Sequence, residues 1–366
     1  MLERLVRTEV SKLEAYEFEP SNRQIAEVVG LQESQIKRFD LNTVPYTLKS
    51  IIQKLAQDFP ELPVNEYPDT SYAEFTRLSA EYTQTDDNMI VIGAGADECV
   101  DIAAKTFLGR ETETILPVPT YSMFRVVTEI MGAQPQEVLR RDDFSIDVDA
   151  LLAKINKKTR MIFLCNPNNP TANATPRKDI ERLLEQAHCM IFVDEAYYEF
   201  YGKSVVNLTY EFENLIVLRT FSKAFCMAGM RAAFLVANPQ TVQLLHKIRP
   251  PNSLCVITVK MAEAALTQPD IIKKIATSIV QERRRLQAKL DYLEGVTTFP
   301  SDANFLLMRF NKVPAKEVHQ KLLQKGIVTR DVSNLPLLEN CLRITVRTNE
   351  DDDFLLESLE EILGIH

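Results

Sequence analysis

The sequence predicts an α/β fold in which helices cover both faces of a mainly parallel sheet. Short apolar runs recur from about Asp86 to about Val236, and each run is continuous rather than alternating. Continuous apolar runs are typical of strands that are buried on both faces. The chain has 366 residues, of which 45% are hydrophobic, so it can bury a large core. A chain of this length suggests about two domains.

We expect one strand from each apolar run. In chain order the runs are 89–92 (MIVI), 161–164 (MIFL), 190–193 (MIFV), 215–218 (LIVL) and 233–236 (AFLV). Ligands of such sheets bind beyond the carboxyl ends of the strands. Four polar residues follow runs in this way, namely Asp97, Asn169, Asp194 and Lys223. We therefore expect these four side chains to meet at one edge of the sheet.

The chain after Thr258 predicts a second, smaller α+β domain. A charged amphipathic stretch at 281–295 is followed by strand-like runs at 305–310 (FLLMRF) and 342–346 (LRITV). The expected division is an N-terminal segment at 1–45 that joins the small domain, a large domain at 46–260 and a small domain at 261–366.

Composition favours small-molecule chemistry in the cytoplasm. The formal net charge of -9 argues against nucleic acid or an anionic membrane as the main partner. The six cysteines are scattered without a C-x-x-C pair, and the four histidines show no metal-ligand spacing. No apolar run approaches the ~20 residues of a membrane span, and no signal peptide is recognised. We expect no metal, no membrane and a reducing compartment.

Lys223 is the first candidate catalytic residue. It follows a predicted strand, lies next to the hydroxyls of Thr220 and Ser222, and precedes Arg231 by eight residues. The amine can form a Schiff base with an aldehyde, and the hydroxyls and guanidinium can bind a phosphate. This pattern therefore suits a phosphorylated aldehyde.

Asp194 is the second candidate, since it ends a buried run. Burying a carboxylate costs several kcal/mol unless a cation or donors meet it, and a protonated pyridine nitrogen is such a cation. Tyr197 and Asn169 could contact an oxygen on the same ring. A helix-capping Asp and an Asn-Pro turn are the simpler structural explanation for each residue alone. Their occurrence together favours a site.

A set of motifs gives the chain a family resemblance over its whole length. The motifs are YPDTSY, GAGADE, PVPTYSMF, NPNNPT, VDEAYYEF, RTFSKAF with AGMR, and LRITV. In this order they resemble the aspartate-aminotransferase superfamily of pyridoxal-phosphate enzymes, most closely its histidinol-phosphate aminotransferase branch. The resemblance implies the type I fold of these transferases, pyridoxal 5'-phosphate as cofactor, and ping-pong transfer of an amino group.

The resemblance also implies a role for each matching residue. Lys223 would carry the cofactor as a Schiff base, Asp194 would pair with the pyridinium, and Tyr121 would stack on the ring. Tyr197 and Asn169 would bind the ring oxygen. The cofactor phosphate would be held by Thr220, Ser222, Arg231 and the backbone N–H groups of Ala96 and Asp97.

Substrate and partner residues follow from the same resemblance. Arg343 would bind the substrate carboxylate, with Asn169 beside it. Tyr16 and Arg330 would face the phosphate end of the substrate. A tyrosine in the position of Tyr67 reaches the phosphate of a neighbouring subunit, which implies a homodimer.

The resemblance makes histidinol phosphate and 2-oxoglutarate the leading substrates. Pro251 stands where the family usually has a tyrosine near the substrate. An aromatic amino acid aminotransferase and a threonine-phosphate decarboxylase-like enzyme therefore remain as alternatives.

Two other classes of protein are disfavoured. GAGADE resembles a dinucleotide-binding loop, but Glu98 occupies the place of the third glycine. Residues 22–38 resemble half of a helix-turn-helix of a DNA-binding regulator, but acids and bases are mixed there. We expect a plain amphipathic helix pair over residues 22–38.

Overall fold

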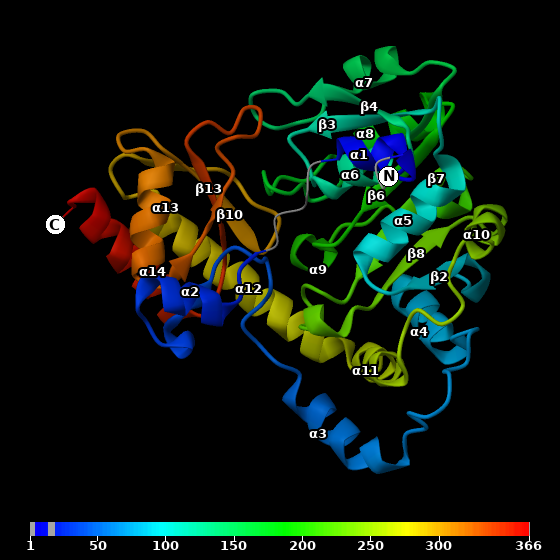
Figure 1. Cartoon of the computed structure of the whole chain (residues 1–366), viewed down its shortest axis with the longest axis horizontal. Helices are drawn as coiled ribbons and strands as arrows, with labels where there is room; N and C mark the ends of the chain where they lie inside the picture. The colour runs from blue at the N-terminus through cyan, green and yellow to red at the C-terminus, as the bar shows by residue number, and fades with distance from the viewer. Residues whose placement is uncertain (1–3, 14–18, 366) are drawn as a thin grey trace.

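The computed structural model describes residues 4–13 and 19–365. Two sheets form the centres of two parts of the molecule, and the long helix α12 runs along both (Figure 1). Tyr16 lies outside the described residues, so its predicted contact with substrate stays a prediction.

The larger sheet has seven strands in the order β2-β8-β7-β6-β5-β3-β4. Only β8 runs antiparallel to its neighbours. The predicted mainly parallel sheet is therefore confirmed. The strands are β2 (Ile90–Gly93), β3 (Glu113–Val118), β4 (Gln134–Leu139), β5 (Thr159–Cys165), β6 (Met190–Asp194), β7 (Leu215–Thr220) and β8 (Ala233–Ala237).

Four of the five apolar runs lie wholly in strands, and the fifth, 89–92, lies in β2 except for Met89, which ends the 3₁₀ turn η4 (Asp87–Met89). These strands are buried along almost their whole length. The structure adds β3 and β4, which no apolar run indicated. β4 is one of the two edge strands, and its residues are exposed or partly buried. Because no residue of β4 is fully buried, this strand needs no continuous apolar run.

Helices pack around this sheet. They are α4 (Ala73–Thr83), α5 (Ala96–Phe107), α6 (Met123–Ile130), α7 (Val148–Lys154), α8 (Arg177–Gln186), α9 (Tyr198–Tyr201), α10 (Pro239–His246) and α11 (Val256–Leu266). Short 3₁₀ turns lie between them at η4 (Asp87–Met89), η5 (Val206–Tyr210) and η6 (Ala228–Met230). α5 buries Cys99, Val100, Ile102 and Ala103, and this fixes its N-terminus beside the end of β2.

The smaller part contains a four-stranded antiparallel sheet in the order β12-β13-β10-β9. Its strands are β9 (Val296–Thr298), β10 (Phe305–Phe310), β12 (Arg330–Asp331) and β13 (Cys341–Thr345). The helices are α12 (Pro269–Leu290), α13 (Ala315–Gln324) and α14 (Asn349–Leu363). β10 contains the first strand-like run that the sequence indicated, and β13 contains the second except for Val346, so this part of the prediction is confirmed.

The N-terminal segment contributes a strand to the smaller part. β1 (Lys37–Arg38) pairs in parallel with β11 (Ile327–Val328). The expected helix pair over residues 22–38 is wrong in its second member. α2 (Asn22–Val29) ends at Gly30 in a left-handed conformation, and a 3₁₀ turn, η2 (Glu33–Gln35), leads into β1. The pairing with β11 takes residues that a second helix would need.

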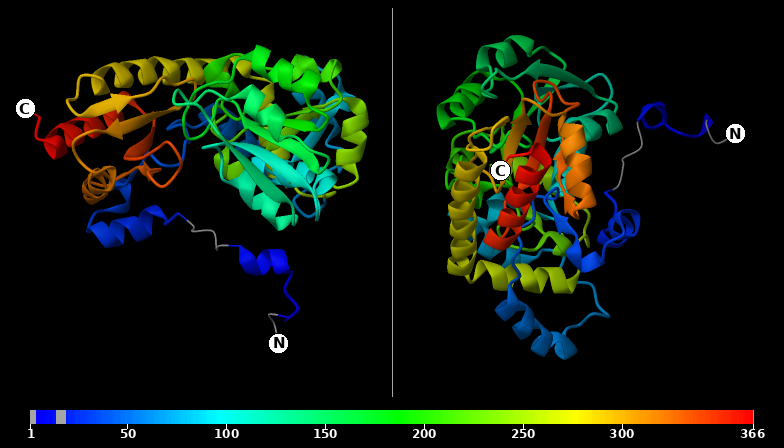
Figure 2. Two further views of the ribbon diagram at one scale, coloured as in Figure 1. Left: turned by 90° about the horizontal axis from the view of Figure 1, so that it is seen from above. Right: turned by 90° about the vertical axis from the view of Figure 1, so that its left-hand side faces the viewer.

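Two N-terminal elements lie at the periphery. α3 (Lys49–Asp58) and the 3₁₀ turn η3 (Phe59–Glu61) project from the body as an arm (Figure 1). α1 (Thr8–Lys12) lies apart from the smaller part (Figure 2) and contacts α6, where Arg7 Nη2 donates to the Ile130 carbonyl at 2.7 Å. In the described part of the chain, no helix has the length and apolar character needed to cross a membrane.

Candidate active site

Asp194 and Lys223 lie at the carboxyl edge of the large sheet. β6 ends in Asp194, which is 3% exposed, and β7 ends three residues before Lys223. One carboxylate oxygen of Asp194, Oδ1, accepts the Ala196 N–H at 2.9 Å. Burial raises the pKa of Asp194 to about 7, although the Ala196 N–H and the charge of Lys223 counteract the shift. The carboxylate thus lacks a fully compensating cation, which a pyridinium nitrogen would supply.

The Lys223 amine faces the chain segment before residue 43. Its Nζ donates to the Leu41 carbonyl at 3.5 Å and lies 5.8 Å from the centre of the Tyr197 ring. Burial, together with the nearby charge of Arg343, lowers the pKa of Lys223 to about 8. A substantial fraction of the amine is therefore neutral near physiological pH and can attack an aldehyde.

Tyr197 is held from two sides. Its ring packs edge-on against Phe305, with centroids 5.2 Å apart, and Asn42 Nδ2 donates to its hydroxyl at 3.0 Å. Tyr197 is 3% exposed, and burial raises the pKa of its phenol. The side chain is therefore a neutral phenol with a fixed orientation.

Arg343 connects β13 to the loop after β5. Its Nη1 donates to Asn169 Oδ1 at 2.7 Å, and its Nη2 donates to the Asp40 carbonyl. Burial lowers the pKa of Arg343. Its Nε is buried without a hydrogen-bond partner. The guanidinium has no ion pair with any described residue, so it can receive an anion.

Arg330 lies next to Arg343, because the two residues are directly opposite each other in the register of β12 and β13. Arg330 is exposed, and its Nη1 lies 3.1 Å from Glu19 Oε1. The structure thus brings the two predicted substrate-binding arginines together at one end of the site.

The predicted phosphate-binding residues gather at the N-terminus of α5. The helix begins at Ala96, and its exposed N–H groups and dipole favour an anion. Thr220 Oγ1 lies 3.1 Å from Ser222 Oγ. Asp97 accepts hydrogen bonds from the Tyr121 hydroxyl at 2.9 Å and from Arg231 Nη2 at 3.1 Å.

Gly95 allows the close approach of Arg231 to this helix. Gly95 has a φ of 87°, and a Cβ atom there would lie 2.5 Å from Arg231 Nη2. The absence of a side chain at Gly95 therefore leaves space for the Arg231 guanidinium. A loop of this kind is suited to contact with a phosphate.

Tyr67 is the one described candidate that the structure does not bring to the site. It lies beyond the α3 arm and is 83% exposed. Among the described residues of one chain, it has no hydrogen bond or ring contact with another candidate residue.

The residues fit pyridoxal phosphate. An amine with a lowered pKa would take the aldehyde, and a buried carboxylate would meet the ring nitrogen. Tyr197 and Asn169 provide polar groups for the ring oxygen, and a helix N-terminus with two hydroxyls and an arginine matches the phosphate. Each part of the cofactor thus has a chemical counterpart.

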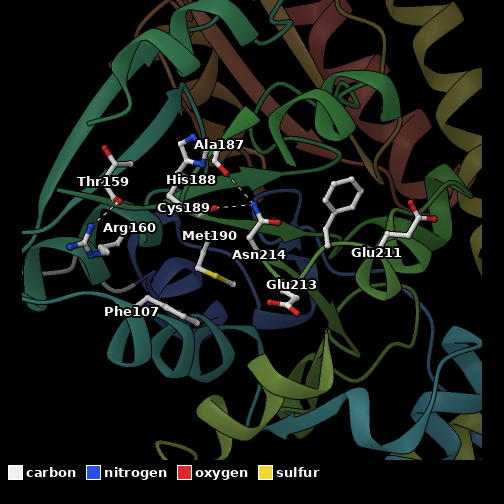
Figure 3. A pocket seen from close by; sticks show the side chains of 11 residues that line it. Phe107, Thr159, Arg160, Ala187, His188, Cys189, Met190, Glu211, Glu213 and Asn214 are labelled. Carbon is white, nitrogen blue, oxygen red and sulfur yellow. Dashed lines mark hydrogen bonds between the residues drawn. The ribbon is translucent and has the colours of Figure 1, made fainter. Parts of the chain in front are cut away.

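A surface recess of ≈ 550 Å³ lies at the opposite edge of the sheet (Figure 3). It is lined by residues just before or at the amino ends of β5, β6 and β7, such as Thr159, Cys189 and Asn214. The Asn214 amide donates to the carbonyls of Leu184, Ala187 and Cys189, which satisfies the end of α8. This recess contains none of the candidate residues, so it is not part of the site.

The sequence motifs missed one wall of the site. Residues 40–42 supply the Asp40 carbonyl to Arg343, the Leu41 carbonyl to Lys223 and the Asn42 amide to Tyr197. A backbone carbonyl leaves no mark in a sequence. Of the three contacts, only that of Asn42 is made by a side chain of this segment. The sequence could indicate it only through the two polar residues Asn42 and Thr43 shortly before Pro45.

The fold and the site together indicate a class of protein, a fold type I pyridoxal-phosphate enzyme. The family model described as "Aminotransferase class I and II" matches residues 26–359. The chain therefore belongs to the class I and II aminotransferases, and the expected enzyme class, a pyridoxal-phosphate-dependent aminotransferase, is confirmed.

Relatives match the chain over its full length. A histidinol-phosphate aminotransferase of Thermoanaerobacter sp. (strain X514) is 34% identical over 99% of this chain and 100% of its own. One from Caldanaerobacter subterraneus subsp. tengcongensis is 33% identical over 100% of both chains. The crystal structure of the Sinorhizobium meliloti histidinol-phosphate aminotransferase, solved with pyridoxal-5'-phosphate, has a TM-score of 0.88 at 23% identity and covers 98% of this chain and 97% of its own. That structure supports the fold.

Proposed function

We propose that the chain transfers the amino group of histidinol phosphate to 2-oxoglutarate. The observation that carries this substrate assignment is the pair Arg330 and Arg343, directly opposite each other on β12 and β13. Two guanidinium groups at one end of a site match a dianionic phosphate. The similarity to full-length histidinol-phosphate aminotransferases supports the same substrate.

Histidinol phosphate carries no carboxylate, whereas glutamate and 2-oxoglutarate carry two. Arg343 would therefore bind a carboxylate in the half-reaction of the oxo acid and assist Arg330 with the phosphate in the other. The hydrogen bond from Arg343 to Asn169 would hold the guanidinium at the same place in both cases. One pair of arginines can thus serve two anions in turn, as a ping-pong reaction requires.

Bound pyridoxal phosphate supplies an electron sink for the carbanion that forms when the substrate loses its α-proton. Asp194 would keep the ring nitrogen protonated through opposite charge at short range. Lys223 would bind the cofactor aldehyde and, once displaced by the amino donor, act as the base that moves the proton. Its lowered pKa of about 8 suits this second task.

The substrate assignment is tested by half-reactions. The holoenzyme is mixed with histidinol phosphate, histidinol, phenylalanine or threonine phosphate, and the change in cofactor absorbance is followed. We expect histidinol phosphate to react at far lower concentrations than histidinol. Equal reactivity of these two donors would contradict the role of the phosphate.

We also propose a homodimer in which Tyr67 reaches the phosphate of the second copy. The arm exposes the apolar side chains of Ile52 (47%) and Phe59 (47%), and the segment after it exposes Val64 (60%) and Tyr67 (83%). Such a cluster on a projecting arm needs a cover, and a second copy provides one. The sedimentation coefficient of the holoenzyme tests this proposal.

The division into domains and the compartment are further proposals. Residues 1–45 are proposed to join the small domain at 261–366. The β1–β11 pairing and the hydrogen bond from Thr345 N–H to the Phe39 carbonyl at 2.7 Å support this division for residues 37–39, whereas α1 contacts α6 in the larger part. Residues 46–260 form the large domain in this proposal. All six cysteines are free thiols, which supports work in a reducing cytoplasm.

A further inference from the structure

Asn42 is a buried residue to which the sequence assigned no role, and it touches a proposed cofactor ligand. It is 2% exposed and has a φ of 54°, in the left-handed region that asparagine tolerates better than most residues. Its Nδ2 donates to the Tyr197 hydroxyl at 3.0 Å. The N-terminal segment thus reaches the phenol that is proposed to face the cofactor ring.

The backbone of Asn42 is held by its neighbours. The Thr345 hydroxyl accepts the Asn42 N–H at 2.9 Å and lies 3.3 Å from Asn42 Oδ1 and 2.9 Å from the Phe39 carbonyl. Asn304 Nδ2 donates to the Asn42 carbonyl at 2.9 Å. The N–H and the carbonyl of Asn42 are therefore both held, and the side chain leaves the backbone from a fixed place. Nδ2 is the amide atom that meets the Tyr197 hydroxyl, at 3.0 Å.

This contact decides what the Tyr197 hydroxyl can do. Because the amide donates to the hydroxyl oxygen, the proton of the hydroxyl must point elsewhere. Over residues 4–13 and 19–365, no acceptor receives that proton. The hydroxyl is thus a spare donor in a buried place, where a donor without an acceptor is costly. An oxygen of a bound ligand would satisfy it.

We propose that Asn42 is a positioning residue that directs the Tyr197 hydroxyl, so that the hydroxyl donates its proton to the ring oxygen of the cofactor. The proposal rests on the proposed function, because it takes Tyr197 as a ligand of that oxygen. Donation spreads the negative charge of the ring oxygen. The charge then holds the proton of the neighbouring Schiff-base nitrogen less tightly, and the visible spectrum of the holoenzyme titrates at a lower pH.

The matched variants are Asn42→Asp and Asn42→Gly. Aspartate has the same shape and tolerates the left-handed backbone, but its carboxylate accepts the Tyr197 proton and turns the hydroxyl away from the cofactor. We expect the spectral midpoint of this holoenzyme to rise by about one pH unit, because a hydrogen bond to a charged group contributes on that order. Glycine keeps the backbone and leaves the hydroxyl free to rotate, so its shift is smaller. If Asn42 had a purely structural role, the shift would be larger in Asn42→Gly, which loses the side chain, than in Asn42→Asp, which keeps its shape.

The Tyr197→Phe background completes the test. In Tyr197→Phe the midpoint also rises, and adding Asn42→Asp should change it no further, because the hydroxyl is already gone. Cofactor dissociation, measured by absorbance, should be faster in Asn42→Asp by about 10-fold. An unchanged midpoint in Asn42→Asp or Asn42→Gly, or a full further shift in the Tyr197→Phe background, overturns the proposal.

The proposed function fails in a distinguishable way. If the wild-type protein never shows a cofactor spectrum, the assignment of Lys223 and Tyr197 as cofactor residues is wrong, and the role of Asn42 is wrong with it. If Asn42→Asp does not fold, Asn42→Gly alone tests the proposal: a small rise of the spectral midpoint supports it, and an unchanged midpoint overturns it.

Discussion

Arg330 and Arg343 lie directly opposite each other on the antiparallel strands β12 and β13. Like charges in this position repel each other, and the pKa of Arg343 is lowered by burial and by the charge of Arg330. The described residues supply one carboxylate to Arg330, from Glu19, and none to Arg343. An anionic substrate that spans both guanidinium groups would relieve the repulsion, and the first two predictions follow from this arrangement.

Replacing Arg330 by Ala removes one of the two guanidinium groups. We expect the KM for histidinol phosphate to rise by about 10- to 100-fold, since hydrogen bonds to charged groups carry this weight. The KM for an unphosphorylated aromatic donor should change far less. Arg284→Ala, at an exposed position of α12, controls for the loss of a surface charge. Equal losses for both donors would rule out the phosphate assignment.

Replacing Glu19 by Gln frees Arg330 from its carboxylate partner. The ion pair is partly exposed, with side-chain exposures of 46% for Arg330 and 32% for Glu19, so salt and water weaken it. We expect inorganic phosphate to inhibit the variant a few-fold more strongly, and the difference to shrink at high salt. A weaker inhibition than in the wild type would mean that Glu19 does not compete with the anion.

The apoenzyme should become less stable as pH rises from about 4 to about 7. In the unfolded chain Asp194 has its ordinary pKa of 3.8, and in the folded protein burial raises this pKa to about 7. Between these values the folded state binds more protons, so the free energy of unfolding falls with rising pH. The full effect is at most about 4 kcal/mol. Urea unfolding of apo Asp194→Asn should lack this contribution, and identical pH profiles for both proteins would contradict it.

Cofactor binding should accelerate with pH through about 8. The neutral form of Lys223 attacks the aldehyde, and burial lowers its pKa to about 8. Stopped-flow mixing of apoenzyme with pyridoxal phosphate measures the rate from pH 6.5 to about 9.5, a range chosen around that pKa. A midpoint near 10.5, the ordinary value for lysine, would show that burial does not act on this amine.

Gly95→Ala should weaken cofactor binding. The added Cβ would lie 2.5 Å from Arg231 Nη2, and the φ of 87° is strained for alanine. We expect roughly 1–2 kcal/mol of lost stability and a weaker cofactor affinity, measured by equilibrium dialysis. Gly109→Ala is the matched control, because nothing lies within 4 Å of its Cβ position. Equal affinity in both variants would show that Arg231 does not need this gap.

The central strands of the large sheet were predictable from the sequence, because buried parallel strands need continuous apolar runs. MIFV, for instance, became β6 and placed Asp194 at its end. β3 and β4 escaped notice, since β3 contains Pro117 and β4, at a sheet edge, has no fully buried residue. The expected second helix before residue 38 was lost to the pairing of β1 with β11, a contact of long sequence separation.

The site, like the fold, has a part that the sequence predicted and a part that it could not. Lys223, Asp194, Tyr197 and Asn169 stand in motifs, whereas the Asp40 and Leu41 carbonyls are backbone atoms that any residue could offer. The contact between Asn42 and Tyr197 joins residues 155 positions apart and follows only from the folded chain. Such contacts depend on the path of the N-terminal segment between β13 and the end of β6, and no local sequence pattern specifies that path.

The most direct measurement is to identify the residue that binds the cofactor. The apoenzyme is mixed with pyridoxal phosphate, reduced with borohydride, digested and examined by mass spectrometry. A single phosphopyridoxyl group on the peptide that contains Lys223 is the predicted result, with no label in Lys223→Ala. Label on another lysine, or equal labelling of the Lys223→Ala protein, would contradict the assignment.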